Sequence, residues 1–119
     1  MDRKFTAAEA RAQLPKLWEV AEEVIEVRVL LVDTAARHQA GDPDVPLADI
    51  KGHEARLAEL LDGLRADGLE VKGWAPLLVD FPSSRDGKDV LLCWLEGETE
   101  LGWYHDPALG FAGRRRLPD

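Results

Sequence analysis

Several residue types are scarce in this chain, and each scarcity excludes a class of protein. The 119 residues include one cysteine, so no disulfide framework can form within the chain and a reducing, cytoplasmic setting is expected. No apolar run approaches the roughly 20 residues that a membrane span needs, and no signal peptide opens the chain. Fifteen basic residues stand against 23 acidic ones, and this net charge of -8 argues against nucleic-acid binding. The composition, 45% hydrophobic and 32% charged, predicts one globular domain over residues 1–119.

The C-terminal part, Trp74–Arg116, has the pattern of an antiparallel sheet. It contains three apolar runs: Leu77–Phe81, Val90–Leu95 and Glu100–His105. The first run meets Pro82, which cannot donate to a strand ladder and is expected to end the strand. The connections Ser84–Gly87 and Glu96–Glu98 are short, and parallel strands would need long crossovers. We therefore predict a three-stranded antiparallel meander.

The preceding part of the chain, residues 6–68, has the pattern of a helical hairpin. Thr6 and Glu9 have the spacing of a capping box, so a helix is expected to begin just after Thr6. Pro15 removes a backbone donor and crowds the preceding turn. We expect a kink or a one-turn break there, with Pro15 beginning the longer helical segment.

The helix after Pro15 carries two apolar rows. The first consists of Leu17, Val20, Val24, Val27 and Leu31, and the second of Trp18, Ala21, Ile25 and Val32. Two rows indicate burial on more than one side. The second row either packs on the sheet or forms a homodimer interface. Residues 24–32 are also rich in β-branched side chains and fit a strand, but helical patterns on both sides favour a helix.

Residues 40–46 combine glycine, proline and aspartate and are the expected linker of the hairpin. The second helix is predicted from about Leu47 to Asp67, and Gly68 has the position of a left-handed C-cap. The whole pattern predicts an α+β fold, in which a kinked antiparallel helical hairpin packs on the meander and a C-terminal Gly/Arg loop closes it. Exposed edges of so small a sheet, together with the two-row helix, favour a homodimer.

Several segments resemble a small bacterial family known as domain of unknown function 2203. The resemblance is carried by Phe5–Ala10, Leu78–Pro82, Asp86–Trp94, His105 and Gly110–Arg115. It covers nearly the whole chain and implies a shared fold without an established activity. The family usually has Trp-His-Glu where this chain has Tyr104, His105 and Asp106, and an acidic residue where this chain has Ala108.

His105, Asp106 and Asp80 are the candidate metal ligands. A histidine beside a carboxylate can hold a metal or act as a base, and Asp80 can approach from another strand if the register permits. No HExxH or CxxC spacing occurs, and His105 with Asp106 also fits an ordinary strand end followed by a turn. Cys93, in the middle of an apolar strand, is expected to be buried and inert.

The C-terminal segment is a candidate anion site. Its glycines and arginines are Gly110, Gly113, Arg114, Arg115 and Arg116. Backbone amides and guanidinium groups together can hold a carboxylate or a phosphate. The alternative is a structural loop in which Phe111 is buried in the core and the arginines pair with acidic helices.

These observations favour a non-catalytic, homodimeric interaction or structural protein, and they identify no cofactor. The alternative is a binding protein or an enzyme with a site for a small molecule, an anion or a divalent metal around His105, Asp106 and the segment from Gly110 to Arg116. A third reading is contact with RNA or a nucleotide through Arg114–Arg116.

Overall fold

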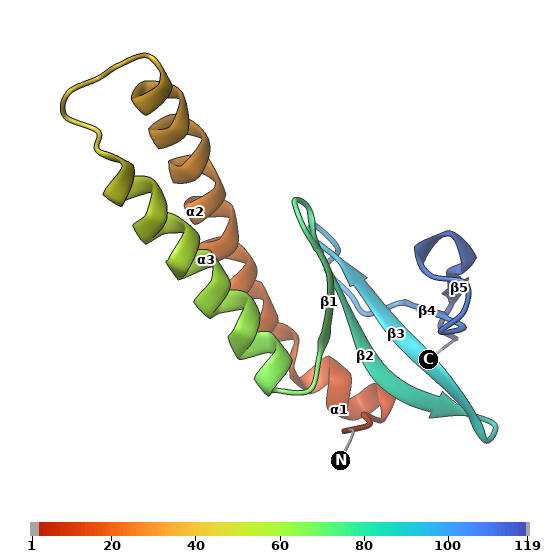
Figure 1. The fold of residues 1–119 in the computed structure, drawn as a ribbon. Coiled ribbons are helices and arrows are strands. Elements are labelled where there is room, and N and C mark those ends of the chain that lie inside the picture. The colour runs from red at the N-terminus through yellow and green to blue at the C-terminus, as the bar shows by residue number, and fades with distance from the viewer. Residues whose placement is uncertain (1–2, 119) are drawn as a thin grey trace.

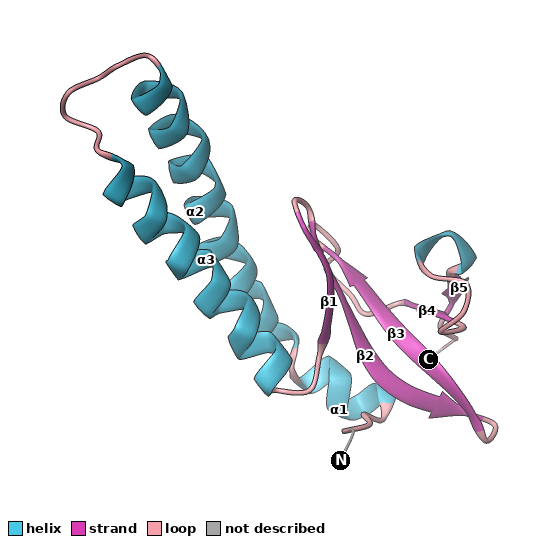
Figure 2. Cartoon of the chain, viewed as in Figure 1, coloured by secondary structure: helices cyan, strands magenta, loops and turns pink. Residues whose placement is uncertain are grey.

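The computed structural model describes residues 3–118 and combines helices with one antiparallel sheet, which confirms the α+β class (Figures 1 and 2). The elements are α1 (Ala7–Ala12), α2 (Leu14–Gln39), α3 (Leu47–Ala66), β1 (Glu70–Trp74), β2 (Leu77–Arg85), β3 (Lys88–Leu95), β4 (Trp103–His105), a 3-10 turn (Phe111–Gly113) and β5 (Arg115–Arg116). No helix within this part of the chain has the length and apolar character needed to cross a membrane.

The start of the chain follows the predicted capping. The Thr6 hydroxyl accepts a 3.0 Å hydrogen bond from the Glu9 amide, and the Glu9 carboxylate accepts a 2.9 Å bond from the Thr6 amide. Helix α1 ends at Ala12, and Pro15 lies in the first turn of α2. Proline is tolerated in a first turn because its missing N–H would have no partner there. The predicted break at Pro15 is confirmed.

The two long helices form the predicted antiparallel hairpin. Helix α2 is continuous through residues 24–32, so the helical reading of that stretch is confirmed. Gly68 ends α3 with a φ of +97°, where its amide donates to Arg65 O at 3.0 Å. The Leu69 amide donates to Leu64 O at 3.1 Å, which completes a Schellman cap.

The sheet has five strands in the order β1 to β5, so the prediction of three strands was wrong. Strand β1 was missed because Glu70–Trp74 is polar and partly exposed, and β5 because it has two residues. The last predicted run shortens to β4, since residues 96–102 form the connection from β3.

Strand β2 does not stop at Pro82 but continues to Arg85, which corrects a second prediction. The Pro82 carbonyl accepts a 2.7 Å bond from the Phe5 amide, so the nitrogen of Pro82 points to the same side, away from β3. Strand β1 reaches only as far as Asp80, so no strand there needs a donor from Pro82.

One face of the sheet packs on the helices. Val79 and Phe81 of β2 lie with Leu92 and Trp94 of β3 in one core cluster with α1, α2 and α3. The hairpin packs on the sheet only near its base, however, and its far half projects beyond the sheet in a molecule measuring 59 × 27 × 25 Å (Figure 1). The predicted packing of the hairpin on the sheet is thus limited to the base of the hairpin.

The second apolar row of α2 is largely exposed. Trp18 is 41% exposed, Ile25 37% and Val32 73%, whereas Ala21, the fourth member of the predicted row, is buried in the core. The sheet therefore does not cover this row, because α2 turns its first row toward α3 and the sheet.

One ion pair joins the hairpin to the sheet. The Arg28 guanidinium donates to both carboxylate oxygens of Glu96, at 2.5 and 2.8 Å, and to Trp74 O at 2.8 Å. The Glu96 carboxylate also accepts from the Leu77 amide at 2.9 Å. The bond from Arg28 is the main cause that lowers the pKa of Glu96 below its ordinary value of 4.5.

Replacing Glu96 with Gln should destabilise the fold by about 1.5–3 kcal/mol at pH 7, the usual worth of hydrogen bonds to a charged group. Because the folded-state pKa of Glu96 is lowered, its contribution is complete above pH 4.5 and is lost as pH falls through that lowered pKa. Denaturant unfolding of both proteins should therefore differ at pH 7 and converge in acid. Glu100→Gln, at an exposed site in the same connection, is the control; an equal effect there would contradict the prediction.

Candidate metal centre

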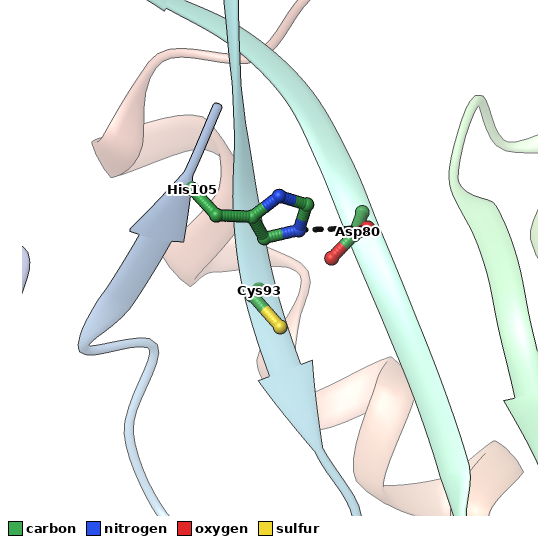
Figure 3. A group of neighbouring side chains, drawn as sticks. All are labelled: Asp80, Cys93 and His105. Carbon is green, nitrogen blue, oxygen red and sulfur yellow. Dashed lines mark hydrogen bonds and ion pairs between the residues drawn. The ribbon is translucent and has the colours of Figure 1, made fainter. Parts of the chain in front are cut away.

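Three titratable side chains meet on the face of the sheet opposite the helices. Asp80 pairs with Cys93 across β2 and β3, and His105 of β4 pairs with Leu91, two residues along β3 from Cys93. Side chains alternate between faces along a strand, so these three share the outer face while Val79 and Trp94 face the helices. Figure 3 shows the His105 ring reaching across β3 toward Asp80, with Cys93 beside it.

The cluster is fully buried. Asp80 is 1% exposed, Cys93 0% and His105 2%, and one potential ligand atom from each lies within 4.8 Å of the others. Each residue contributes a different donor type: a carboxylate oxygen, a thiol sulfur and an imidazole nitrogen. Clusters of three such groups are uncommon in a core unless they are hydrogen-bonded or bind a ligand.

Hydrogen bonds determine how His105 is protonated. Its Nδ1 lies 2.9 Å from the backbone oxygen of Asp106, which can only accept, so Nδ1 carries a proton. Its Nε2 lies 3.1 Å from Oδ2 of Asp80. A hydrogen bond at that position needs one proton between the two atoms, carried by either the ring or the carboxyl group. The pair is therefore neutral overall in both forms.

Burial dominates the electrostatics of the other two groups. Desolvation raises the pKa of Asp80 above 3.8, opposed by its interactions with His105 and Cys93. Desolvation, together with the charge of Asp80, raises the pKa of the Cys93 thiol to about 12. The structure therefore confirms that Cys93 is buried, and the raised pKa of its thiol favours the protonated, less reactive form at neutral pH.

Two buried polar atoms at this site have no hydrogen-bond partner among residues 3–118: Oδ1 of Asp80 and Nε of Arg114. An unpartnered buried polar group costs about 1–3 kcal/mol, so such atoms are rare. One atom is an acceptor and the other a donor. The two groups lie on either side of Cys93. Asp80 pairs with Cys93 across the strands, and the Arg114 guanidinium donates to the Cys93 carbonyl.

Arg114 is held beside Cys93 by contacts on several sides. Its Nη2 donates to Glu98 Oε1 at 2.6 Å and to Cys93 O at 3.3 Å. Its guanidinium carbon lies 4.9 Å from the centre of the Trp103 ring and 4.6 Å from that of Phe111. These contacts fix the guanidinium plane beside β3.

The predicted ligand set is altered by one residue. Asp80 and His105 meet as predicted, but the Asp106 side chain accepts from the Ala108 amide at 2.8 Å and forms a turn outside the cluster. Cys93 takes the third place. Counting outward from the Asp86-Gly87 turn pairs Asp80 with Cys93, so the sequence contained the signal that would have found it.

The glycine–arginine segment differs from the structural alternative, and the anion site stays a prediction. Phe111 is 44% exposed, so the expectation that it is buried in the core was wrong; its ring stacks on Arg114 instead. Gly110 has a φ of +66°, and a Cβ on Gly113 would lie 2.6 Å from that of Leu109. Of the five residues proposed for an anion site, Arg114 contacts the cluster, whereas Arg115 and Arg116 lie exposed on β5.

The sequence profile of one family matches residues 3–117, nearly the whole chain. The chain belongs to the DUF2203 family. That family is described as an uncharacterized conserved protein, so membership confirms the resemblance and assigns no chemistry. No curated protein and no solved structure matches the chain significantly. The function therefore has to be argued from the outer face of the sheet.

The Cys93 thiol should resist modification in the native protein. With a pKa of about 12, its thiolate fraction at pH 8 is roughly a thousandfold below that of an ordinary cysteine with a pKa of about 8.5. A disulfide reagent should react with Cys93 only after denaturant is added. The control is the variant Cys93→Ser/Ser84→Cys, which moves the single thiol to an exposed site and should react at once. Fast reaction of native Cys93 would contradict the burial described above.

Proposed function

We propose that this protein binds one divalent transition metal ion of the zinc class through Asp80, Cys93 and His105. The observation that carries the proposal is the convergence of three different ligand types within 4.8 Å in a fully buried position. Three separate strands supply them, so a bound ion would link β2, β3 and β4 on the face away from the helices.

The donor set supports zinc or cobalt rather than magnesium or calcium. Magnesium and calcium prefer oxygen ligands throughout, whereas zinc is commonly held by mixed sulfur, nitrogen and oxygen atoms. Bonds of about 2.0–2.3 Å in a tetrahedron place neighbouring ligand atoms about 3.3–3.8 Å apart. Because the three ligand atoms lie within 4.8 Å of one another, adjustments of about 1 Å or less per atom would bring them to that spacing.

The surroundings also fit a metal. The carbonyl of Asp106 receives the Nδ1 proton of His105 and leaves Nε2 as the ligand, which is the usual outer contact of a metal-bound histidine. The unpartnered Oδ1 of Asp80 would gain a cation nearby. Metal binding would displace the thiol proton and the proton between His105 and Asp80, leaving two anionic ligands to balance a divalent ion.

Purified, tag-free protein should bind one equivalent of Co²⁺, with a thiolate-to-cobalt absorption band, and Zn²⁺ should displace it. Cys93→Ser and His105→Gln should each weaken binding by more than about 100-fold, since even outer-shell partners contribute about 10–100-fold. The metal should also raise the melting temperature of the unsubstituted protein but not of these variants.

Asp106→Asn and His53→Gln are the matched controls, because they change the same residue types outside the cluster. Both should bind Co²⁺ as the unsubstituted protein does. Circular dichroism of each variant separates lost binding from lost folding. Folded, unsubstituted protein that shows neither the absorption band nor a thermal shift would refute the metal site.

The exposed row on α2 supports a second function, self-association. Trp18, Ile25 and Val32 recur every seven residues, the repeat of a helix that pairs with another along a left-handed seam. The opposite side of α2 already packs on α3, and the sheet leaves the row uncovered. In a two-fold dimer the same patch of each copy meets its counterpart, so we propose a homodimer in which α2 packs against α2 of the second copy.

Sedimentation equilibrium at micromolar concentration should give about twice the chain mass of 13.2 kDa. Ile25→Asp places a charge in the centre of the seam and should yield a monomer with an unchanged circular dichroism spectrum. Ala58→Asp, which adds the same charge to an exposed position of α3, should remain dimeric. A monomeric unsubstituted protein at high concentration would rule out the dimer while leaving the metal site untouched.

A further inference from the structure

We infer that the metal centre takes an organic carboxylate as its exogenous ligand, with the carboxylate held by Arg114 and an apolar tail in the adjacent cleft. This inference rests on the proposed metal site and adds the chemical class of its ligand. It starts from the second unpartnered atom of the site, Nε of Arg114.

Arg114 cannot satisfy Nε by turning away. Glu98 and the Cys93 carbonyl engage Nη2, and the rings of Trp103 and Phe111 flank the guanidinium plane. The buried Nε donor is therefore fixed beside Cys93 of β3. An arginine whose N–H groups are held in one plane is suited to receive a carboxylate oxygen.

Three protein ligands leave a zinc-class ion with an open coordination position. A neutral water molecule on the metal is a poor acceptor, whereas a metal-bound hydroxide can accept one bond from the Nε proton. A carboxylate offers two acceptor oxygens, so that one can bind the metal while the other accepts from Arg114. One bound carboxylate would thus give Arg114 Nε a hydrogen-bond acceptor and also fill the fourth coordination position of the metal.

A cleft of about 720 Å³ lies beside Phe111, and its lining also includes Trp74, Pro76, Leu78 and Leu95. Phe111 belongs both to this lining and to the stack on Arg114. Leu78 pairs with Leu95, and this pair lies two residues along the strands from the pair of Asp80 and Cys93. That step is about 6.7 Å, so a tail of a few carbon atoms or one ring spans it.

The lining of the cleft sets the character of the tail. Its side chains are mostly apolar, and two of them, Trp74 and Phe111, are aromatic residues that are nearly half exposed. The amine of Lys72 also lines it but lies 2.8 Å from Glu70. Apolar walls with a charged group at one end are typical of sites for small amphipathic molecules.

The test is a titration of Co²⁺-loaded protein with phenylacetate, with formate as a carboxylate without a tail and chloride as the ionic-strength control. Phenylacetate should change the cobalt absorption spectrum and tighten Co²⁺ binding by about fivefold or more, as reciprocal coupling between two ligands requires. Formate should act in the same direction at higher concentration, and chloride at equal ionic strength should not reproduce the effect.

Three variants separate the parts of the proposal. Arg114→Gln should still bind Co²⁺ within about tenfold of the unsubstituted protein but lose the response to both carboxylates. That loss is measurable because couplings of about 5–150-fold are typical of linked sites. Trp74→Ala should reduce the phenylacetate effect to the level of formate. Arg115→Gln, at an exposed neighbour, should respond as the unsubstituted protein does.

Each contrary result has a distinct meaning. Cobalt binding without any response to carboxylates overturns the ligand and leaves the metal site standing, whereas absence of cobalt binding overturns both. Equal effects of phenylacetate and formate overturn the role of the cleft. If Arg114→Gln weakens Co²⁺ binding more than tenfold without any carboxylate present, the guanidinium serves the Cys93 thiolate and the inference is wrong.

Discussion

The register between β2 and β3 is the constraint on which the rest of the molecule depends. It is set by the two-residue turn at Asp86 and Gly87, where both residues adopt positive φ. In this register Val79 and Phe81 face the helices, and Asp80 lies opposite Cys93 on the other face. A slip of one residue would exchange the two sets, placing a carboxylate in the apolar core and opening the outer cluster. The core and the candidate site are thus two consequences of one pairing.

The outer face is unusual because it buries titratable groups without a layer of helices over them. A short C-terminal segment provides the cover instead: Arg114 lies beside β3, and Leu117 donates to Gly102 O at 2.8 Å and so completes the edge. Gly110 and Gly113 allow this segment to turn closely over the sheet. The cover is held by polar contacts and ring stacking rather than by a large apolar core.

The sequence predicted the local features better than the long-range ones. The cap at Thr6, the break at Pro15 and the C-cap at Gly68 depend on a few neighbouring residues, and each was found. Strand β1 was missed because an edge strand exposed on one side lacks the apolar run that marks β3. Pro82 was misread because the absence of a partner strand beyond Asp80 is a property of the assembled sheet.

The candidate site shows the same limit. Asp80 and His105 were identified by residue type, but Asp106 was preferred to Cys93 because it adjoins His105 in sequence. Adjacent residues on a strand point to opposite faces, so sequence neighbours rarely form one site there. The exposure of Phe111 could not be predicted from its neighbours in sequence either. Its ring stacks on Arg114, which is positioned by Glu98 and Trp103 from other parts of the chain.

Because half of the helical hairpin projects beyond the sheet, α2 and α3 could be longer or shorter without changing the contacts between hairpin and sheet. Beyond the Arg28 contact, α2 and α3 pack mainly on each other. At the far end, the linker of residues 40–46 is held to α2 by the ion pair of Arg37 with Asp42 and by the hydrogen bond of His38 with Val45 O. Seven residues inserted into each helix would add about two turns while keeping the same faces together. The sheet and its buried cluster would not be disturbed. The distance that the hairpin extends from the sheet could therefore change without altering the cluster of Asp80, Cys93 and His105.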